Sequence, residues 1–405
     1  MSNQRLWGLT LLERNIKELQ ILGIKEIIMA TASESDPRDQ FCQPWPSELK
    51  IKLNIATDVD PFESLIVALQ ESKELILVLE GHALNDRRVL KKLVEVPFPC
   101  AVISTTGSLK AGAAVLSAND TSLFINSRNK KLTHLFIEAI QDSKIQKLDL
   151  TQFDPYIENL RREIHPYLLL IESSKQLKEA DQLLRQTVHK GVNDFVAKYI
   201  HPPLEFGAAR FLTSTPITPN QITLLWIILA GITILLFANG HLYWGIFIAA
   251  ACGVLDGIDG KLARLTLHFS KAGDLLDHIS NTVYDALWYL ALGWYFSNGD
   301  LNSTAAQFTM ILFIAYIVER VVPGIFKKLH GYEIYDYQEI DKVARLIGSR
   351  MNNNVWVLML GIIFGLAQET FYAISLWMLT TASWHTLRLF WVTWKTRIKK
   401  PVFTS

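Results

Sequence analysis

Apolar residues are arranged differently in the two halves of this chain. Residues 1–190 interrupt short apolar runs with a charge every few positions, whereas residues 220–395 contain long apolar stretches separated by short polar loops. We expect six helices in the second half, at residues 220–238, 242–255, 277–297, 304–326, 353–367 and 370–392. About 20 apolar residues in a helix cross a hydrocarbon core of ~30 Å. The pattern therefore predicts an all-α, six-helix transmembrane domain.

Basic residues predict how these helices are oriented. Lys and Arg gather in every second loop and in the tail, as Lys261, Arg264, Lys271, Lys327, Lys328, Lys342, Arg345, Arg350, Lys395, Arg397, Lys399 and Lys400. The loops at 239–241, 298–303 and 368–369 carry neither residue type. Because cytoplasmic loops are enriched in Lys and Arg, we expect six spans with both termini in the cytoplasm. Just before them, residues 191–212 mix apolar and basic residues, which is typical of a helix lying in the membrane interface.

The first half reads as a soluble domain. Residues 6–30 predict an amphipathic helix followed by a strand, and residues 74–96 predict a buried strand, a loop and a second helix. Such alternation favours an α/β domain with a mostly parallel sheet. We therefore predict four parts: an α/β domain at 1–150, a helical connection at 151–190, the interfacial helix at 191–212 and the membrane domain at 213–398.

Composition narrows the possible functions. The chain has 405 residues and a net charge of +1, and no basic patch interleaved with aromatic residues indicates binding to nucleic acid. The N-terminus lacks the apolar core of a signal peptide. We therefore expect the first half to stay in the cytosol.

Aspartates follow directly on the second apolar run. In a helix, Asp256, Asp259 and Ala263 share one face, and Asp274, Asp277 and Asn281 repeat that spacing, with Asp285 one turn further on. Two such helices could cage divalent cations, which take carboxylate oxygens and share substrate phosphates. The alternative is a set of Asp–Lys and Asp–Arg pairs at the membrane surface. Ionisable residues near a bilayer are nevertheless functional candidates by default.

The glycines between these acids have two interpretations. Gly257 and Gly260 lie where a side chain would otherwise stand, which permits the close approach of a ligand. Close packing of helices through small residues explains them equally well.

The motif carries a family resemblance. Asp256-x2-Asp259-Gly260-x2-Ala263-Arg264-x8-Gly273-x3-Asp277-x3-Asn281 resembles the signature of CDP-alcohol phosphotransferases, D-x2-D-G-x2-A-R followed by G-x3-D-x3-D. Pro219-Asn220-x2-Thr223 resembles the start of that family's first helix. The resemblance implies transfer of a substituted phosphate from a CDP-alcohol to a second alcohol, with release of CMP. It also implies a role for each motif residue.

By this resemblance, the metal ligands would be Asp256, Asp259 and Asp277, which would hold two Mg²⁺ or Mn²⁺ ions. The nucleotide pocket would be lined by Asn220, Thr223, Gly260 and Ala263, with Arg264 near the phosphates. The partners would be a CDP-alcohol, an alcohol or phospho-alcohol acceptor and membrane lipids, and a homodimer is plausible for the family.

Asn281 departs from the family pattern. The family's fourth aspartate is the usual candidate for metal contact and for general base, and an asparagine cannot accept the proton. Three explanations stay open. Asp285, Asp274 or His278 acts as base; the metals activate the acceptor without a protein base; or the enzyme is impaired. With Asn281 and Asp285, Asp277 is counted among the candidate catalytic residues. A non-catalytic membrane protein that binds CDP-alcohols or anchors a partner is the alternative function.

The first half resembles a nucleotidyltransferase domain acting on sugar or inositol phosphates. Its order before the membrane domain resembles the bifunctional inositol-phosphate cytidylyltransferase/di-inositol-phosphate phosphate synthases. No glycine-rich nucleotide loop precedes Leu11, and Gly81-His82 stands where that fold usually has Gly-Asp. We therefore expect this domain to be catalytically degenerate.

Overall fold

The computed structural model describes residues 5–41, 50–104, 109–125 and 130–399. The chain divides into two compact units. The first comprises residues 1–189 with the short segments 212–216 and 265–267, and the second contains the remaining residues.

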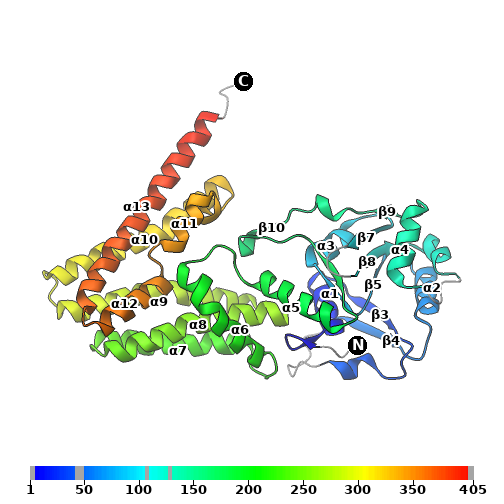
Figure 1. Cartoon of the computed structure of the whole chain (residues 1–405), viewed down its shortest axis with the longest axis horizontal. Helices are drawn as coiled ribbons and strands as arrows, with labels where there is room; N and C mark the ends of the chain where they lie inside the picture. Colours follow the sequence, from blue (N-terminus) through cyan, green and yellow to red (C-terminus); the bar gives the residue numbers. More distant parts are fainter. Residues whose placement is uncertain (1–4, 42–49, 105–108, 126–129, 400–405) are drawn as a thin grey trace. The chain divides into compact units, whose positions relative to one another are not determined.

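The first unit is an α/β domain (Figure 1). Its described helices are α1 (Leu11–Ile21), α2 (Pro61–Glu71), α3 (Arg87–Glu95), α4 (Leu132–Gln141) and α5 (Ser174–Val188). Its central sheet has the order β5-β8-β7-β9, formed by Ile76–Leu79, Ala111–Leu116, Cys100–Ser104 and Gln146–Lys147. β3 (Glu26–Ala30) and β4 (Lys52–Ala56) form a separate parallel pair.

The prediction of a mostly parallel sheet was wrong. β8 pairs antiparallel with both β5 and β7, and among the described strands of this sheet only β7 and β9 form a parallel pair. The reason is the short connection from Ser104 to Ala111, since a parallel pair needs a crossover of roughly a dozen residues or more.

The sheet buries both of its faces. In β8, Ala113 and Val115 pack into one apolar cluster with α3, while Ala114 and Leu116 pack into another with α2 and α4. This alternation follows from the two-residue period of a strand. Residues 151–189, almost all of the predicted connection at 151–190, also belong to this unit and are helical mainly in α5. Their first part contributes β12 (Leu168–Leu170), which pairs with β6 (Ala83–Asn85).

The second unit is helical. A π-helical turn at Val196–Ile200 leads into α6 (His201–Leu212), where we expected the interfacial helix. The six long helices that follow are α7 (Pro219–Ala238), α8 (Leu242–Thr266), α9 (Lys271–Ser297), α10 (Thr304–His330), α12 (Met351–Ile363) and α13 (Ala367–Lys399). They lie where the apolar stretches predicted helices. We did not predict α11 (Glu339–Ile347), a short helix in the basic loop before α12.

Aromatic and aliphatic side chains form the core of this unit. Trp226, Phe237, Trp288 and Leu312 are buried where α7, α9 and α10 pack together. Two of the helices, α7 and α10, are long and apolar enough by themselves to cross a membrane. On both, apolar side chains also remain exposed, such as Leu235 on α7 and Met310 on α10.

Candidate functional site

The site is built where α8 ends and α9 begins. Only residues 267–270 separate the two helices, and Ser270 starts α9 by accepting a hydrogen bond from the Gly273 backbone N–H at 3.1 Å. A connection this short makes the helices neighbours. The two halves of the aspartate motif are therefore brought together.

Asn281 joins two of the acids. Its Nδ2 donates to Asp256 Oδ1 at 2.7 Å and to Asp277 Oδ1 at 3.1 Å. Asp256 lies on α8, whereas Asp277 and Asn281 lie one turn apart on α9. The structure thus unites three motif residues, and the amide stands between two carboxylates.

Asp259 is fixed separately. It is buried, and its Oδ2 accepts hydrogen bonds from Thr223 Oγ1 at 2.6 Å and from Trp226 Nε1 at 3.3 Å, both on α7. Thr223, which the resemblance assigns to the nucleotide pocket, therefore contacts a predicted metal ligand directly. Sequence reasoning overlooked Trp226, whose position three residues after Thr223 on the same helix was the available signal.

Asn220 and Gly273 bring the start of α7 close to α9. A Cβ added to Gly273 would lie 2.2 Å from Asn220 Oδ1. The motif glycine therefore admits the polar start of α7 beside α9.

Arg264 lies among the acids. A Cβ added to Gly260 would lie 3.2 Å from Arg264 Nη2, so the glycine leaves room for the guanidinium. Arg264 interacts electrostatically with Asp259, Asp277 and Asp256. Ala263, one residue earlier, is half-buried.

The donor set suits a hard divalent cation. Among the residues that the structure describes, no three His, Cys, Asp or Glu side chains stand close enough together to hold a metal ion as they are placed here. Yet Asp256 and Asp277 already converge on a single nitrogen, and Asp259 lies one turn from Asp256. A cation in place of the amide nitrogen would be bound by the same two carboxylates, which are ligands that Mg²⁺ and Mn²⁺ prefer.

Gly257 faces a side chain of the protein. A Cβ at this position would lie 1.8 Å from Glu205 Oε1, on α6. Glu205 forms a buried ion pair with Lys261, which lies one turn after Gly257 on α8. Of the two interpretations of this glycine, the structure supports close packing.

The α6 groups beside the motif are poorly solvated. Burial raises the pKa of the Glu205 carboxyl, which Lys261 opposes. Burial also lowers the pKa of His201, one turn earlier, whose Nδ1 lies 3.9 Å from Glu205 Oε1. The role of Glu205 could not be predicted, because an interfacial helix was expected to direct its charges toward water.

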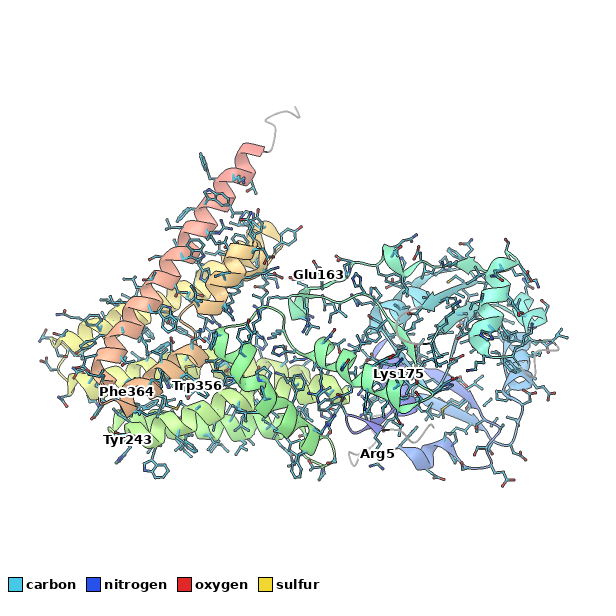
Figure 2. The ribbon with its side chains drawn as sticks, in the orientation of Figure 1. Arg5, Glu163, Lys175, Tyr243, Trp356 and Phe364 are labelled. Atoms are coloured by element: carbon cyan, nitrogen blue, oxygen red, sulfur yellow. The ribbon has the colours of Figure 1, made fainter. Side chains whose placement is uncertain are left out.

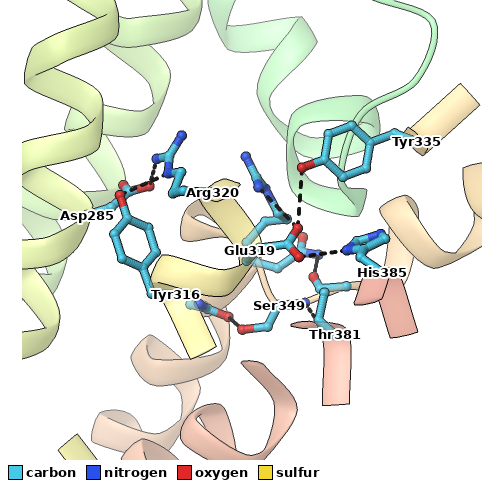
Figure 3. Close-up of polar contacts among 12 residues, drawn as sticks. Asp285, Tyr316, Glu319, Arg320, Tyr335, Ser349, Thr381 and His385 are labelled. Atoms are coloured by element: carbon cyan, nitrogen blue, oxygen red, sulfur yellow. Dashed lines mark hydrogen bonds and ion pairs between the residues drawn. The ribbon is translucent and has the colours of Figure 1, made fainter. Parts of the chain in front are cut away.

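The three candidate bases have different surroundings. Asp285 is buried and forms an ion pair with Arg320 Nη2 at 2.5 Å, and the Arg320 Nε donates to the Tyr316 hydroxyl at 2.9 Å (Figure 3). Asp274 and His278 are largely exposed, with side-chain exposures of 80% and 73%. His278 Nδ1 lies 2.9 Å from the Asp274 carbonyl oxygen.

A second polar cluster surrounds Glu319. Its carboxylate lies 2.6 Å from His385 Nδ1 and 3.6 Å from Arg350 Nη1, and the Tyr335 hydroxyl donates to it at 3.4 Å (Figure 3). Arg345 stacks over the Tyr335 ring at 4.2 Å. Beyond Asp285 on α9, a second group of charged and polar side chains is thus formed by Glu319 on α10, Arg350 just before α12 and His385 on α13.

In the first unit, the predicted strand end carries a half-buried acid. Glu80 follows β5, and its Oε1 accepts hydrogen bonds from the backbone N–H and hydroxyl of Thr133 at 3.3 and 3.2 Å. Asp86 instead caps α3 and pairs with Arg88 at 2.7 Å. The two acids therefore have separate structural partners.

Comparison with known proteins agrees with the motif. Residues 216–398 match the family model described as CDP-alcohol phosphatidyltransferase. A "Bifunctional IPC transferase and DIPP synthase" of Aquifex aeolicus is 21% identical over 91% of this chain and 88% of its own length. A protein of the same name from Thermococcus kodakarensis is 27% identical over 49% of this chain and 44% of its own length.

Part of the chain also aligns with a solved structure. The phosphatidylinositol phosphate synthase of Mycobacterium tuberculosis, crystallised with CDP-DAG bound, aligns with 47% of this chain and 93% of its own, at 16% identity and a TM-score of 0.35. The family resemblance read from the motif is confirmed for the C-terminal region by the family model. This family match does not favour the non-catalytic alternative.

Proposed function

We propose that this protein is an integral membrane transferase, which moves a substituted phosphate from a CDP-alcohol to an alcohol or phospho-alcohol and releases CMP. One observation carries the proposal. The α8–α9 turn gathers Asp256, Asp277 and Asn281 within hydrogen-bonding distance, inside the region that matches the family model.

The acids would hold the divalent cations. When bound, two Mg²⁺ or Mn²⁺ ions would neutralise the donor's pyrophosphate and so make CMP a better leaving group. Asp256, Asp259 and Asp277 would be their ligands, and Thr223 and Trp226 orient the Asp259 carboxylate.

Other motif residues would bind the donor. Arg264 would place its guanidinium beside the phosphates, where charge builds up as the bond to CMP breaks. Asn220, Gly260 and Ala263 would line the nucleotide pocket, as the family resemblance implies.

Asp277 is the best placed group to accept the proton of the acceptor hydroxyl. Asn281 engages its Oδ1, and Oδ2 lies 3.9 Å from His278 Nδ1. Asp285 is less suited, because its carboxylate is already paired with Arg320. We therefore propose that the acceptor is activated at the cation site with help from Asp277.

An acceptor carrying a phosphate would find basic groups nearby. Arg350 interacts electrostatically with Asp285, as Arg320 does, so two guanidiniums lie near the α9 turn after Asn281. Arg345 stacks on Tyr335, Lys327 pairs with Glu333 at 3.0 Å, and Arg350 lies 3.6 Å from Glu319, but of these three only Arg350 is among the groups that act on Asp285. Among the basic residues considered from the sequence, Arg350 is therefore the preferred contact for a phospho-alcohol.

The helices would cross the membrane six times, with both termini and the acid cluster on the cytoplasmic side. Tyr243 and Phe364 support this placement, because both are exposed and they lie at one end of the bundle, at the loops without Lys or Arg (Figure 2). Aromatic residues are enriched at membrane interfaces. A homodimer, as the resemblance implies, would be tested by the mass of the protein in native nanodiscs.

Metal-dependent CMP release tests the function. Purified protein would be supplied with CDP-diacylglycerol or CDP-inositol, a panel of polyols and polyol phosphates, and Mg²⁺ or Mn²⁺. We expect CMP release that requires the cation and an acceptor. Asp277→Ala should lower it at least ~100-fold, the lower range for loss of a general base.

The contrary outcomes are also informative. CDP-alcohol binding without CMP release from any pair would favour the non-catalytic alternative. Release that Asp277→Ala leaves unchanged would separate the activity from this site. Asp274→Ala is the matched control, because Asp274 is an exposed acid of the same helix turn.

A further inference from the structure

Asn281 changes the charge of the site as well as removing a base. Asp256, Asp259 and Asp277 contribute three negative charges, and Arg264 interacts with all three. With Asn281 in place of a fourth acid, one divalent cation balances the remaining charge. A second cation would leave an excess of positive charge beside the buried Asp259, where uncompensated charge is unfavourable.

The hydrogen bonds point the same way. The Asn281 amide occupies one oxygen of Asp256 and one of Asp277, at 2.7 and 3.1 Å. Thr223 and Trp226 occupy Oδ2 of Asp259. The Gly260 backbone N–H donates to the other oxygen, Oδ1 of Asp259, at 2.5 Å. Four of the six carboxylate oxygens of these acids are therefore engaged by donors of the protein itself, and a cation must compete with those donors.

The CDP-alcohol can supply the negative charge and the oxygen ligands that a second cation needs. Each phosphate of a CDP-alcohol carries one negative charge, and their oxygens are good ligands for hard cations. Binding the pyrophosphate therefore adds both charge and ligands beside Asp256 and Asp277.

We infer that Asn281 makes the second cation depend on the donor: the protein alone binds no more than one divalent ion, and the second binds together with the pyrophosphate. This inference rests on the proposed function. It requires that the cation and the nucleotide each raise the other's affinity by the same factor, since the coupling of two ligands is reciprocal.

Mn²⁺ binding to the full chain tests the inference without any assay of activity. Equilibrium dialysis of protein in nanodiscs, with electron paramagnetic resonance of free Mn²⁺, would count bound ions with and without CDP as the probe. Labelled CDP would be counted in the same samples, because CDP also binds Mn²⁺ in solution. We expect up to one ion without CDP, two with CDP, and a CDP affinity about tenfold higher with Mn²⁺.

Asn281→Asp should remove this dependence. A fourth carboxylate restores the missing charge, so the variant should bind two Mn²⁺ ions without CDP. Two tightly bound ions on the unaltered protein without CDP would overturn the inference. So would a count that CDP leaves unchanged, and this comparison needs no variant.

Failure of the proposed function would look different. If neither Mn²⁺ nor CDP binds under any condition, the site is no cation and nucleotide site at all. If both bind and Asp277→Ala binds them equally well, they bind elsewhere.

Discussion

Asp277, Asn281 and Asp285 lie on successive turns of α9, and each has a different partner. Asp277 receives a hydrogen bond from Asn281, Asn281 also bonds to Asp256 on α8, and Asp285 pairs with Arg320 on α10. The same four-residue spacing therefore places side chains in two different environments. The first two residues belong to the candidate cation site, and the third joins α9 to α10.

Replacing Asp285 tests this division. Asp285→Asn should lower the melting temperature, since Arg320 loses a buried counter-ion. CMP release should fall less than about tenfold and keep the shape of its pH profile. If Asp285 were the base, the rate would instead fall by ~10²–10⁴ and one limb of the profile would disappear. Arg320→Gln is the matched control, and the double variant should be no less stable than either single variant.

At the scale of elements, α6 and α8 are locked together beside the motif. Glu205 of α6 reaches the position where Gly257 has no side chain and pairs with Lys261, whose ammonium also lies 5.5 Å from the Phe206 ring centroid. Because Lys261 lies two residues after Asp259, this contact positions the end of α8 that carries the acids.

Adding one methyl group at Gly257 should break the ion pair between Glu205 and Lys261. In Gly257→Ala the new Cβ would displace the Glu205 carboxylate and leave Lys261 buried without its partner. We expect the free energy of unfolding to fall by roughly 3 kcal/mol, as for other broken buried pairs, measured as a loss of melting temperature in detergent. Gly207→Ala on α6 is the control, because its Cβ would meet nothing within 4 Å. Equal melting temperatures for the two variants would contradict this account.

The same contacts show what could be predicted from the sequence. Local patterns predicted the six long helices, the convergence of α8 and α9 at the acids, and the mixed α/β unit. These patterns are the length of the apolar stretches, the spacing of the motif and the alternation of strands and helices. Partners such as Glu205, Trp226 and Arg320 could not be predicted, because each depends on which helices pack together. The antiparallel placement of β8 was missed for a related reason, since the pattern of a strand does not state its direction.

At the scale of the whole molecule, the first unit differs at its start from the fold that it resembles. In the first unit, α1 is preceded by a short hairpin of β1 (Arg5–Leu6) and β2 (Leu9–Thr10), which pair only with each other among the described strands. This hairpin stands where the resembled fold would have a strand and a glycine-rich loop leading into the helix. The Glu80 carboxylate is engaged by Thr133, and Asp86 by Arg88. Each of these two acids thus has a structural partner of its own.

We therefore predict that the chain uses a CDP-alcohol but does not make one. Full-length protein given CTP, inositol 1-phosphate and Mg²⁺ should release no pyrophosphate above the level of a heat-inactivated sample, while the same preparation releases CMP from a supplied CDP-alcohol. The second assay controls for folding and for the cation. Pyrophosphate release that Glu80→Gln abolishes would show instead that the first unit is active. Without such release, the donor must come from a separate cytidylyl-transferring enzyme, and the first unit would serve the membrane domain by its structure alone.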